Sequence, residues 1–173
     1  MSSLPSSGRP VLLLDIDGAL SPLPHPDDMD FDRFVVTNAR QWLRRGDMLF
    51  DTALPGYLDR LGAVYQRVWA TSWSQLEINR WVAPVLGLPQ DLPYIEFGTQ
   101  SNKLRHIADW VGRHGPGLPV AWVDDRLGAA ERRWAKKRQA PTLLVSTDKY
   151  EGIVASDVVR LLAFGTGAIV SVG

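Results

Sequence analysis

The feature that most constrains the fold of this chain is a run of four apolar residues, Val11 to Leu14, that ends in two aspartates separated by one residue. An uninterrupted apolar run of this length is typical of a strand buried on both faces, as in a parallel sheet with helices on each side. Ligands bind at the carboxyl ends of the strands in such sheets. Asp15 and Asp17 repel each other there unless a cation, a shared proton or hydrogen-bond donors stabilise them. The run therefore predicts a buried parallel strand with a functional site at its end.

Strands and helices are predicted to alternate along the rest of the chain. Further apolar runs predict strands over residues 64–70, 94–97, 120–123 and 142–145. Helical spacing and capping signals predict helices that begin near Pro55, Ser74, Ser101, Leu127 and Asp157. Such alternation implies right-handed crossovers and a parallel sheet. We therefore predict a single α/β domain over residues 1–173, a three-layer Rossmann-like sheet with helices on both faces and a flexible tail at 1–9.

The segment between the first two predicted strands suggests a flap. Residues 21–32 contain three prolines and several acids and are expected to be a loop. Short apolar runs at 34–36 and 48–50 favour a hairpin, although residues 38–43 also fit a helical turn. The gap from 21 to 65 holds this flap and a helix, and one helix and one strand account for the stretch from 73 to 102. We therefore expect no independent cap domain and an open site that admits a large molecule.

Composition narrows the possible classes of protein. A length of 173 residues fits one domain with a sizeable core. The 19 basic and 19 acidic residues cancel, which gives no support for nonspecific binding to nucleic acid or membranes. The absence of cysteine excludes a disulfide framework, a thiolate zinc site and a cysteine nucleophile. The first eight residues do not resemble a signal peptide and no segment is long enough to span a bilayer, so we expect a cytoplasmic protein.

Chemically useful side chains follow several of the predicted strands. They are Asp15 and Asp17, then Thr71 and Ser72, then Lys103 at a helix start, then Asp124 and Asp125. Because the carboxyl ends of parallel strands share one edge of the sheet, these groups are expected to converge there.

Their chemistry suits phosphoryl transfer through a covalent aspartyl intermediate. Asp15 is placed to attack phosphorus. Asp17 would protonate the departing alkoxide and then activate the hydrolytic water. Several carboxylates around one point favour a hard cation, and Mg²⁺ fits best. Lys103 and Thr71 would supply positive charge and a hydroxyl donor to the phosphoryl oxygens.

This order of residue types resembles the haloacid dehalogenase-like (HAD) hydrolase superfamily. The matching segments are Leu14–Gly18, Trp69–Ser72, Lys103 and Trp122–Asp125. The resemblance implies an HAD-like fold, a phosphoric monoester hydrolase and a phosphorylated substrate. It implies Asp15 as nucleophile, Asp17 as general acid and base, and Thr71, Ser72 and Lys103 as phosphate ligands. It also implies a Mg²⁺ site formed by Asp15, by Asp17 through the Ile16–Asp17 backbone, and by Asp124 or Asp125.

Three details refine the resemblance. Ala19 stands where many members have threonine or valine, a change that touches neither carboxylate. Dehalogenases lack the second acid, because a halide leaves without a proton, so Asp17 favours phosphate esters. Segments 69–73, 84–89 and 140–145 look like a small bacterial branch of predicted hydrolases.

Other functions remain open at this point. A phosphoacceptor domain of the response-regulator kind uses similar groups, but its lysine follows the last strands, whereas Lys103 precedes Asp124. A silent binding module is a further alternative, against which the intact Asp15 and Asp17 speak. A nuclease-like metal site is another, but it does not explain Thr71 and Lys103 together. A polynucleotide-end phosphatase is another, since the basic run at 132–138 is either a solvated helix face or a rim that attracts a polyanion. Trp73 is a candidate for stacking on a substrate ring.

Overall fold

The computed structural model describes residues 8–23, 31–37, 48–97 and 102–172. Its centre is a parallel sheet whose strands lie in the order β4, β1, β5 and β6. The strands are β1 (Val11–Leu14), β4 (Gln66–Trp69), β5 (Val120–Asp124) and β6 (Thr142–Ser146). Leu14 pairs with Trp69 on one side and with Val123 on the other, so these three strands end together.

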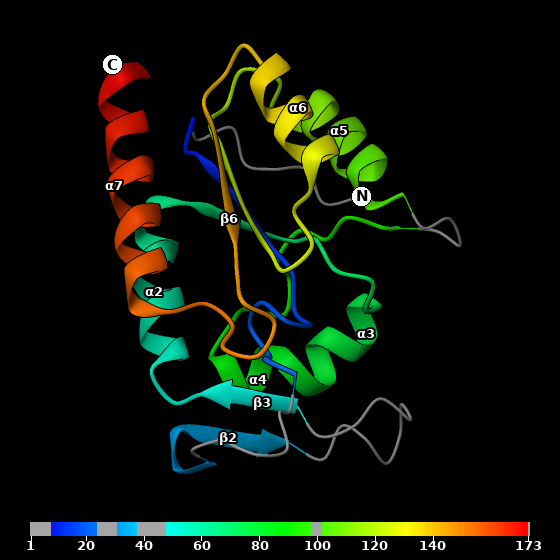
Figure 1. Ribbon diagram of the computed structural model, residues 1–173, viewed down its shortest axis with the longest axis vertical. Coiled ribbons are helices and arrows are strands. Elements are labelled where there is room, and N and C mark those ends of the chain that lie inside the picture. The colour runs from blue at the N-terminus through cyan, green and yellow to red at the C-terminus, as the bar shows by residue number, and fades with distance from the viewer. Residues whose placement is uncertain (1–7, 24–30, 38–47, 98–101, 173) are drawn as a thin grey trace.

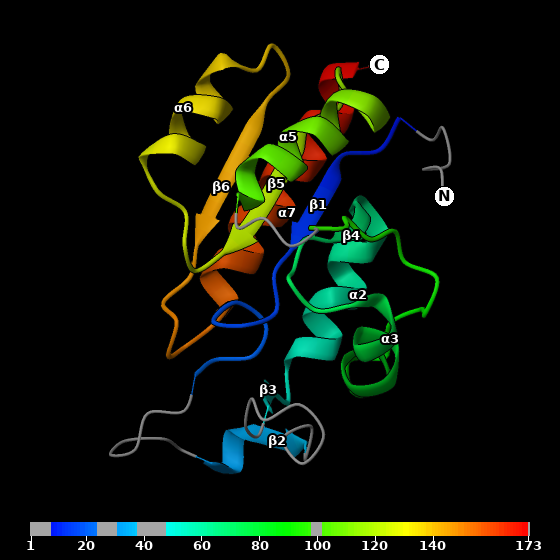
Figure 2. The same cartoon turned by 90° about the vertical axis from the view of Figure 1, so that its right-hand side faces the viewer.

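Helices cover both faces of the sheet, as Figures 1 and 2 show. On one face lie α2 (Leu54–Val64) and the long α7 (Ala155–Val172), and on the other lie α5 (Lys103–His114) and α6 (Ala129–Lys137). The residues of β1 alternate between two hydrophobic cores. Leu12 and Leu14 belong to the core on the α2 and α7 side, and Val11 and Leu13 to the core on the α5 side. The predicted three-layer α/β fold is therefore confirmed.

The helical segment after β4 begins at a capping box. Ser74 Oγ accepts from the backbone N–H of Glu77 at 3.3 Å, and the Glu77 carboxylate accepts from the backbone N–H of Ser74 at 2.7 Å. The segment comprises α3 (Gln75–Glu77), the π-helical turn η2 (Ile78–Val82) and α4 (Ala83–Leu86). It ends at Gly87, whose φ of 63° is left-handed, a conformation that favours glycine at the end of a helix.

The predicted strand at 94–97 is wrong in extent. Only an isolated bridge joins Tyr94 to Trp69, flanked by hydrogen bonds of Trp69 to the backbone of Pro93 and Ile95. The pairing with β4 does not extend further, because Pro93 has no N–H to donate and because β4 ends at Trp69.

The predicted hairpin is confirmed. It consists of the single turn η1 (Phe31–Arg33) and the antiparallel strands β2 (Phe34–Thr37) and β3 (Met48–Asp51). The hairpin lies beyond the carboxyl ends of the parallel strands (Figures 1 and 2). The alternative helical turn at 38–43 lies outside the described residues. In the part of the chain that the structure describes, there is no large cap.

The predicted N-terminal tail at 1–9 is described only from Gly8 onward. Arg9 is tied to the end of α2, since its guanidinium donates to the backbone oxygens of Gly62 at 2.5 Å and Val64 at 3.3 Å. The extent of the domain over the whole chain stays a prediction.

Candidate active site

Asp15 lies directly after β1, and a tight turn follows it. The Asp15 side chain is almost buried, and its backbone N–H donates to the oxygen of Val123 at 3.1 Å. The turn needs glycine at position 18, where φ is 73°. A Cβ added to Gly18 would lie 2.7 Å from Cγ of Asp125, so a side chain there would displace that carboxylate.

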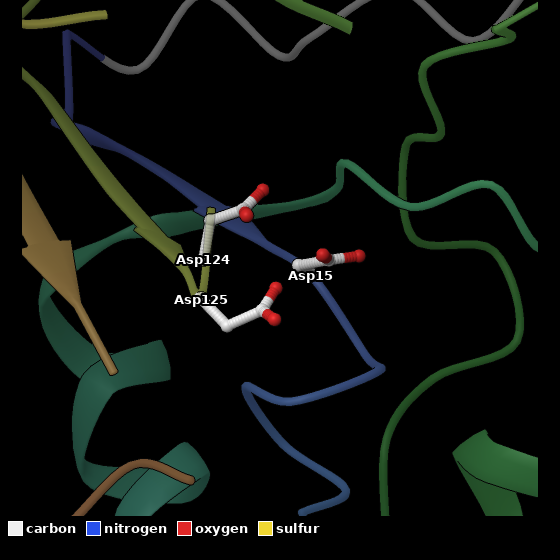
Figure 3. Close-up of side chains that lie close together, drawn as sticks. All are labelled: Asp15, Asp124 and Asp125. Carbon is white, nitrogen blue, oxygen red and sulfur yellow. The ribbon is translucent and has the colours of Figure 1, made fainter. Parts of the chain in front are cut away.

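Three carboxylates meet at this edge of the sheet (Figure 3). Asp124 is the last residue of β5 and Asp125 follows it, next to the end of β1. Oxygens of Asp15, Asp124 and Asp125 all lie within 4.8 Å of one another. The expected convergence of Asp15 with Asp124 and Asp125 is thus present in the structure.

Lys103 reaches the same point from the first turn of α5. Its Nζ lies 2.7 Å from Oδ2 of Asp15 and 2.5 Å from Oδ2 of Asp124. The start of the helix is fixed by Asn102, whose side chain accepts from the backbone N–H of Arg105 at 3.1 Å. A cation is disfavoured at a helix N-terminus, so the position of Lys103 depends on these two carboxylates.

One lysine does not offset the negative charge of this cluster. Burial raises the pKa of Asp15 from 3.8 to about 6 although Lys103 opposes the shift, and the charge of Asp124 adds to it. Burial and the charge of Asp124 likewise raise the pKa of Asp125. A set of oxygen ligands with uncompensated negative charge fits a hard divalent cation such as Mg²⁺.

Asp124 is held by two hydrogen bonds that we did not predict. The indole N–H of Trp122 donates to Oδ2 at 3.2 Å, and the backbone N–H of Arg126 donates to Oδ1 at 2.8 Å. Residues two apart on a strand share a face, which is the signal that could have identified Trp122. The Arg126 side chain is exposed, with its Nε 3.8 Å from Oδ2 of Asp125.

Asp17 lies outside the cluster of three carboxylates and contacts the loop after β4 instead. Its Oδ2 accepts a hydrogen bond from the indole N–H of Trp73 at 3.0 Å. Trp73 is only 1% exposed, so the hypothesis that it stacks on a substrate ring is wrong.

Thr71 and Ser72 follow β4 at the same edge of the sheet. Thr71 is fully buried, and its Oγ1 accepts a long hydrogen bond of 3.5 Å from the backbone N–H of Trp73. Ser72 is exposed. Their roles as phosphate ligands, like the metal role of Asp17, stay predictions.

The loop after β6 supports the turn after β1, which sequence reasoning also missed. Thr147 Oγ1 donates to the oxygen of Gly18 at 2.8 Å, and the backbone N–H of Ile153 donates to the oxygen of Ala19 at 2.8 Å. Gly152 has a φ of 70°, and a Cβ there would lie 2.7 Å from the oxygen of Ala19. A side chain at position 152 would therefore separate the two loops.

Most of the basic run at 132–138 is exposed on α6. Arg132, Arg133, Lys136 and Lys137 are exposed, as a solvated helix face requires. Arg138 has a structural role instead, because its guanidinium donates to Thr142 Oγ1 at 2.6 Å and to the oxygen of Leu118 at 2.8 Å.

Comparison with known proteins agrees with this geometry. No curated protein matches the sequence. Within the described residues, none of the helices is both long and apolar enough to cross a lipid bilayer. The sequence model of a family described as the HAD domain in Swiss Army Knife RNA repair proteins matches residues 11–158, which include every carboxylate of the site. The chain therefore belongs to this family of HAD domains.

Proposed function

We propose that the protein is a Mg²⁺-dependent phosphomonoesterase that forms an aspartyl-phosphate intermediate on Asp15. The observation that carries this proposal is the meeting of Asp15, Asp124 and Asp125 around Nζ of Lys103. Membership in an HAD family supports hydrolase chemistry at that point.

The reaction has two steps. In the first, a carboxylate oxygen of Asp15 forms a bond to phosphorus, the bond from phosphorus to the ester oxygen breaks, and Asp17 gives its proton to the departing alkoxide. In the second, Asp17 accepts a proton from water as that water attacks phosphorus, and the bond from Asp15 to phosphorus breaks. The products are an alcohol and inorganic phosphate, and both aspartates return to their initial states.

The residues present fit a divalent ion. Asp15, Asp124 and Asp125 would hold Mg²⁺ with their carboxylates, and the HAD resemblance adds the Ile16–Asp17 backbone. When bound, Mg²⁺ supplies charge neutralisation for the phosphoryl oxygens. Lys103 contributes positive charge to the same oxygens, and its two ion pairs hold it at that place before substrate binds.

We further propose the phosphorylated end of a polynucleotide as the substrate class. The matched family is named for RNA repair proteins. The described part of the chain contains no large cap over the strand ends, and a site without a large cap admits a large substrate.

Activity measurements test both parts of the proposal. Asp15→Asn is expected to lower kcat by at least about 10⁴-fold on an aryl phosphate, because it removes the nucleophile. Asp109→Asn, at an exposed position of α5, serves as the matched control and should retain activity. Chelation of Mg²⁺ should abolish turnover in the native protein, and readdition should restore it.

The substrate class is tested with RNA oligonucleotides that carry a terminal phosphate, compared with mononucleotides and sugar phosphates. A higher kcat/KM for the oligonucleotides supports the polynucleotide proposal, and a preference for small phosphates overturns it. A stable phosphoaspartate without turnover would instead indicate a regulatory phosphoacceptor, and undiminished turnover by Asp15→Asn would disprove the mechanism.

A further inference from the structure

We infer that Trp73 is a positioning residue for the general acid, and that its indole N–H holds the carboxyl group of Asp17 in the orientation that protonates the leaving group. This inference rests on the proposed function, since it concerns the step in which Asp17 gives up its proton. The two residues are 56 positions apart in the chain, yet Nε1 of Trp73 lies 3.0 Å from Oδ2 of Asp17.

The chemistry of the indole group defines which carboxyl oxygen carries the proton. An indole nitrogen donates a hydrogen bond and accepts none. Oδ2 of Asp17 therefore acts as an acceptor towards Trp73, and because a carbonyl oxygen accepts better than a hydroxyl oxygen, this hydrogen bond favours the acidic proton on Oδ1. The hydrogen bond thus leaves Oδ1 as the oxygen that delivers a proton to substrate and later receives one from water.

The surroundings of Trp73 make it a rigid donor. Its side chain is 1% exposed and packs in the same core as Ile78, the fourth residue of the helical segment after the cap. The capping box between Ser74 and Glu77 fixes the backbone immediately after it. The backbone N–H of Trp73 contacts Oγ1 of Thr71. A single short loop therefore places both the donor to Asp17 and the predicted phosphate ligand.

Another tryptophan offers a matched control. Trp69 is also 1% exposed and lies four residues earlier, at the end of β4. Within the described part of the chain its indole N–H has no hydrogen-bond partner. Trp69→Phe and Trp73→Phe remove the same atoms from the same core, and only the second removes a donor to a carboxylate.

The test measures how kcat/KM depends on the leaving group. Two substrates of similar shape are used with Mg²⁺, para-nitrophenyl phosphate, whose leaving group departs with little need of a proton, and para-methylphenyl phosphate, whose leaving group needs one. The value of kcat/KM reports the first step, in which the alkoxide or phenoxide departs. The readout is the ratio of the two kcat/KM values within each variant, and this ratio does not depend on the fraction of protein that is active.

Trp73→Phe is expected to lower kcat/KM for the methylphenyl ester by about 10-fold or more, and for the nitrophenyl ester by about 2-fold at most. Trp69→Phe should leave the ratio unchanged. Asp17→Asn removes the general acid itself, so the shift in the ratio that it causes is the upper limit for the shift expected of Trp73→Phe.

The outcomes separate the two hypotheses. If Asp17→Asn shifts the ratio and Trp73→Phe lowers both values by the same factor or by none, Trp73 is only a packing residue and the inference fails alone. If Asp17→Asn does not shift the ratio, Asp17 is not the general acid, and the acid–base role in the proposed mechanism fails together with the inference. Should Trp73→Phe not fold, benzothienylalanine at position 73, which replaces the N–H by sulfur in a ring of the same shape, gives the same comparison.

Discussion

The carboxylate of Asp15 must be ionised to attack phosphorus, whereas its burial favours the neutral form. The pKa of about 6 lies above the value of 3.8 expected in an unfolded chain, and burial is the main cause. A raised pKa in the folded state means that ionisation of Asp15 reduces stability. This cost is absent below about pH 4, develops as the pH rises and is complete above about pH 6.

Asp15→Asn is therefore expected to stabilise the metal-free protein. Its free energy of unfolding should rise by about 1 to 3 kcal/mol at about pH 8 and by little at about pH 4, where Asp15 is itself neutral. Urea unfolding at the two pH values measures the difference. Asp109→Asn, at an exposed position of α5, is the matched control, and a loss of stability in Asp15→Asn at high pH would contradict the interpretation.

The residues that meet at the site were predictable to different degrees. Asp15, Lys103 and Asp124 could be brought together from chain order alone, because parallel strands end at a common edge. The hydrogen-bond donors to the carboxylates could not be predicted in this way. Whether the indoles of Trp73 and Trp122 point at Asp17 and Asp124 depends on side-chain rotamers and on the path of a loop, which residue spacing does not specify.

At the scale of elements, the turn after β1 sets how close the carboxylates come. Gly18 adopts a left-handed backbone conformation, and the carboxylate of Asp125 occupies the space that a side chain at position 18 would need. Both the conformation and the close approach exclude other residues, so the turn and the carboxylate cluster form as one unit.

Gly18→Ala should lower the free energy of unfolding by about 1 to 3 kcal/mol and weaken Mg²⁺ binding, because of backbone strain and displacement of Asp125. Gly112→Ala is the matched control. Gly112 lies within α5 and has open space where the methyl group of alanine would lie, so alanine there should stabilise the helix by about 1 kcal/mol. Thermal unfolding and Mg²⁺ titration measure both effects, and equal behaviour of the two variants would contradict the account.

Elements were predictable where a local signal was strong. The run 11–14, the capping box at Ser74 and the apolar spacing of α5 gave the correct type of structure. The strand expected at 94–97 failed because pairing there depends on where β4 ends and on Pro93. The last helix, predicted to begin near Asp157, starts at Ala155 and continues to Val172, since it packs along α2 and its apolar positions continue to that residue in sequence.

For the whole molecule, the proposed metal site at the acidic cluster would link folding to metal binding. A ligand that binds the folded state alone stabilises it by about 3 kcal/mol when its concentration is 100 times its dissociation constant. We expect saturating Mg²⁺ to raise the unfolding temperature by several degrees, and Asp124→Asn to abolish most of that increase. Differential scanning calorimetry of the native protein, Asp124→Asn and Asp109→Asn tests this, and an unchanged increase in Asp124→Asn would show that Mg²⁺ acts elsewhere.

The hydrogen bond from Thr147 to Gly18 joins positions separated by 129 residues and has a consequence for synthesis. When Asp15 and Asp17 of a nascent chain have emerged from the ribosome, the loop after β6 that supports their turn has not yet emerged. The turn after β1 therefore gains this support late in translation, once β6 and the loop after it are free to contact Gly18.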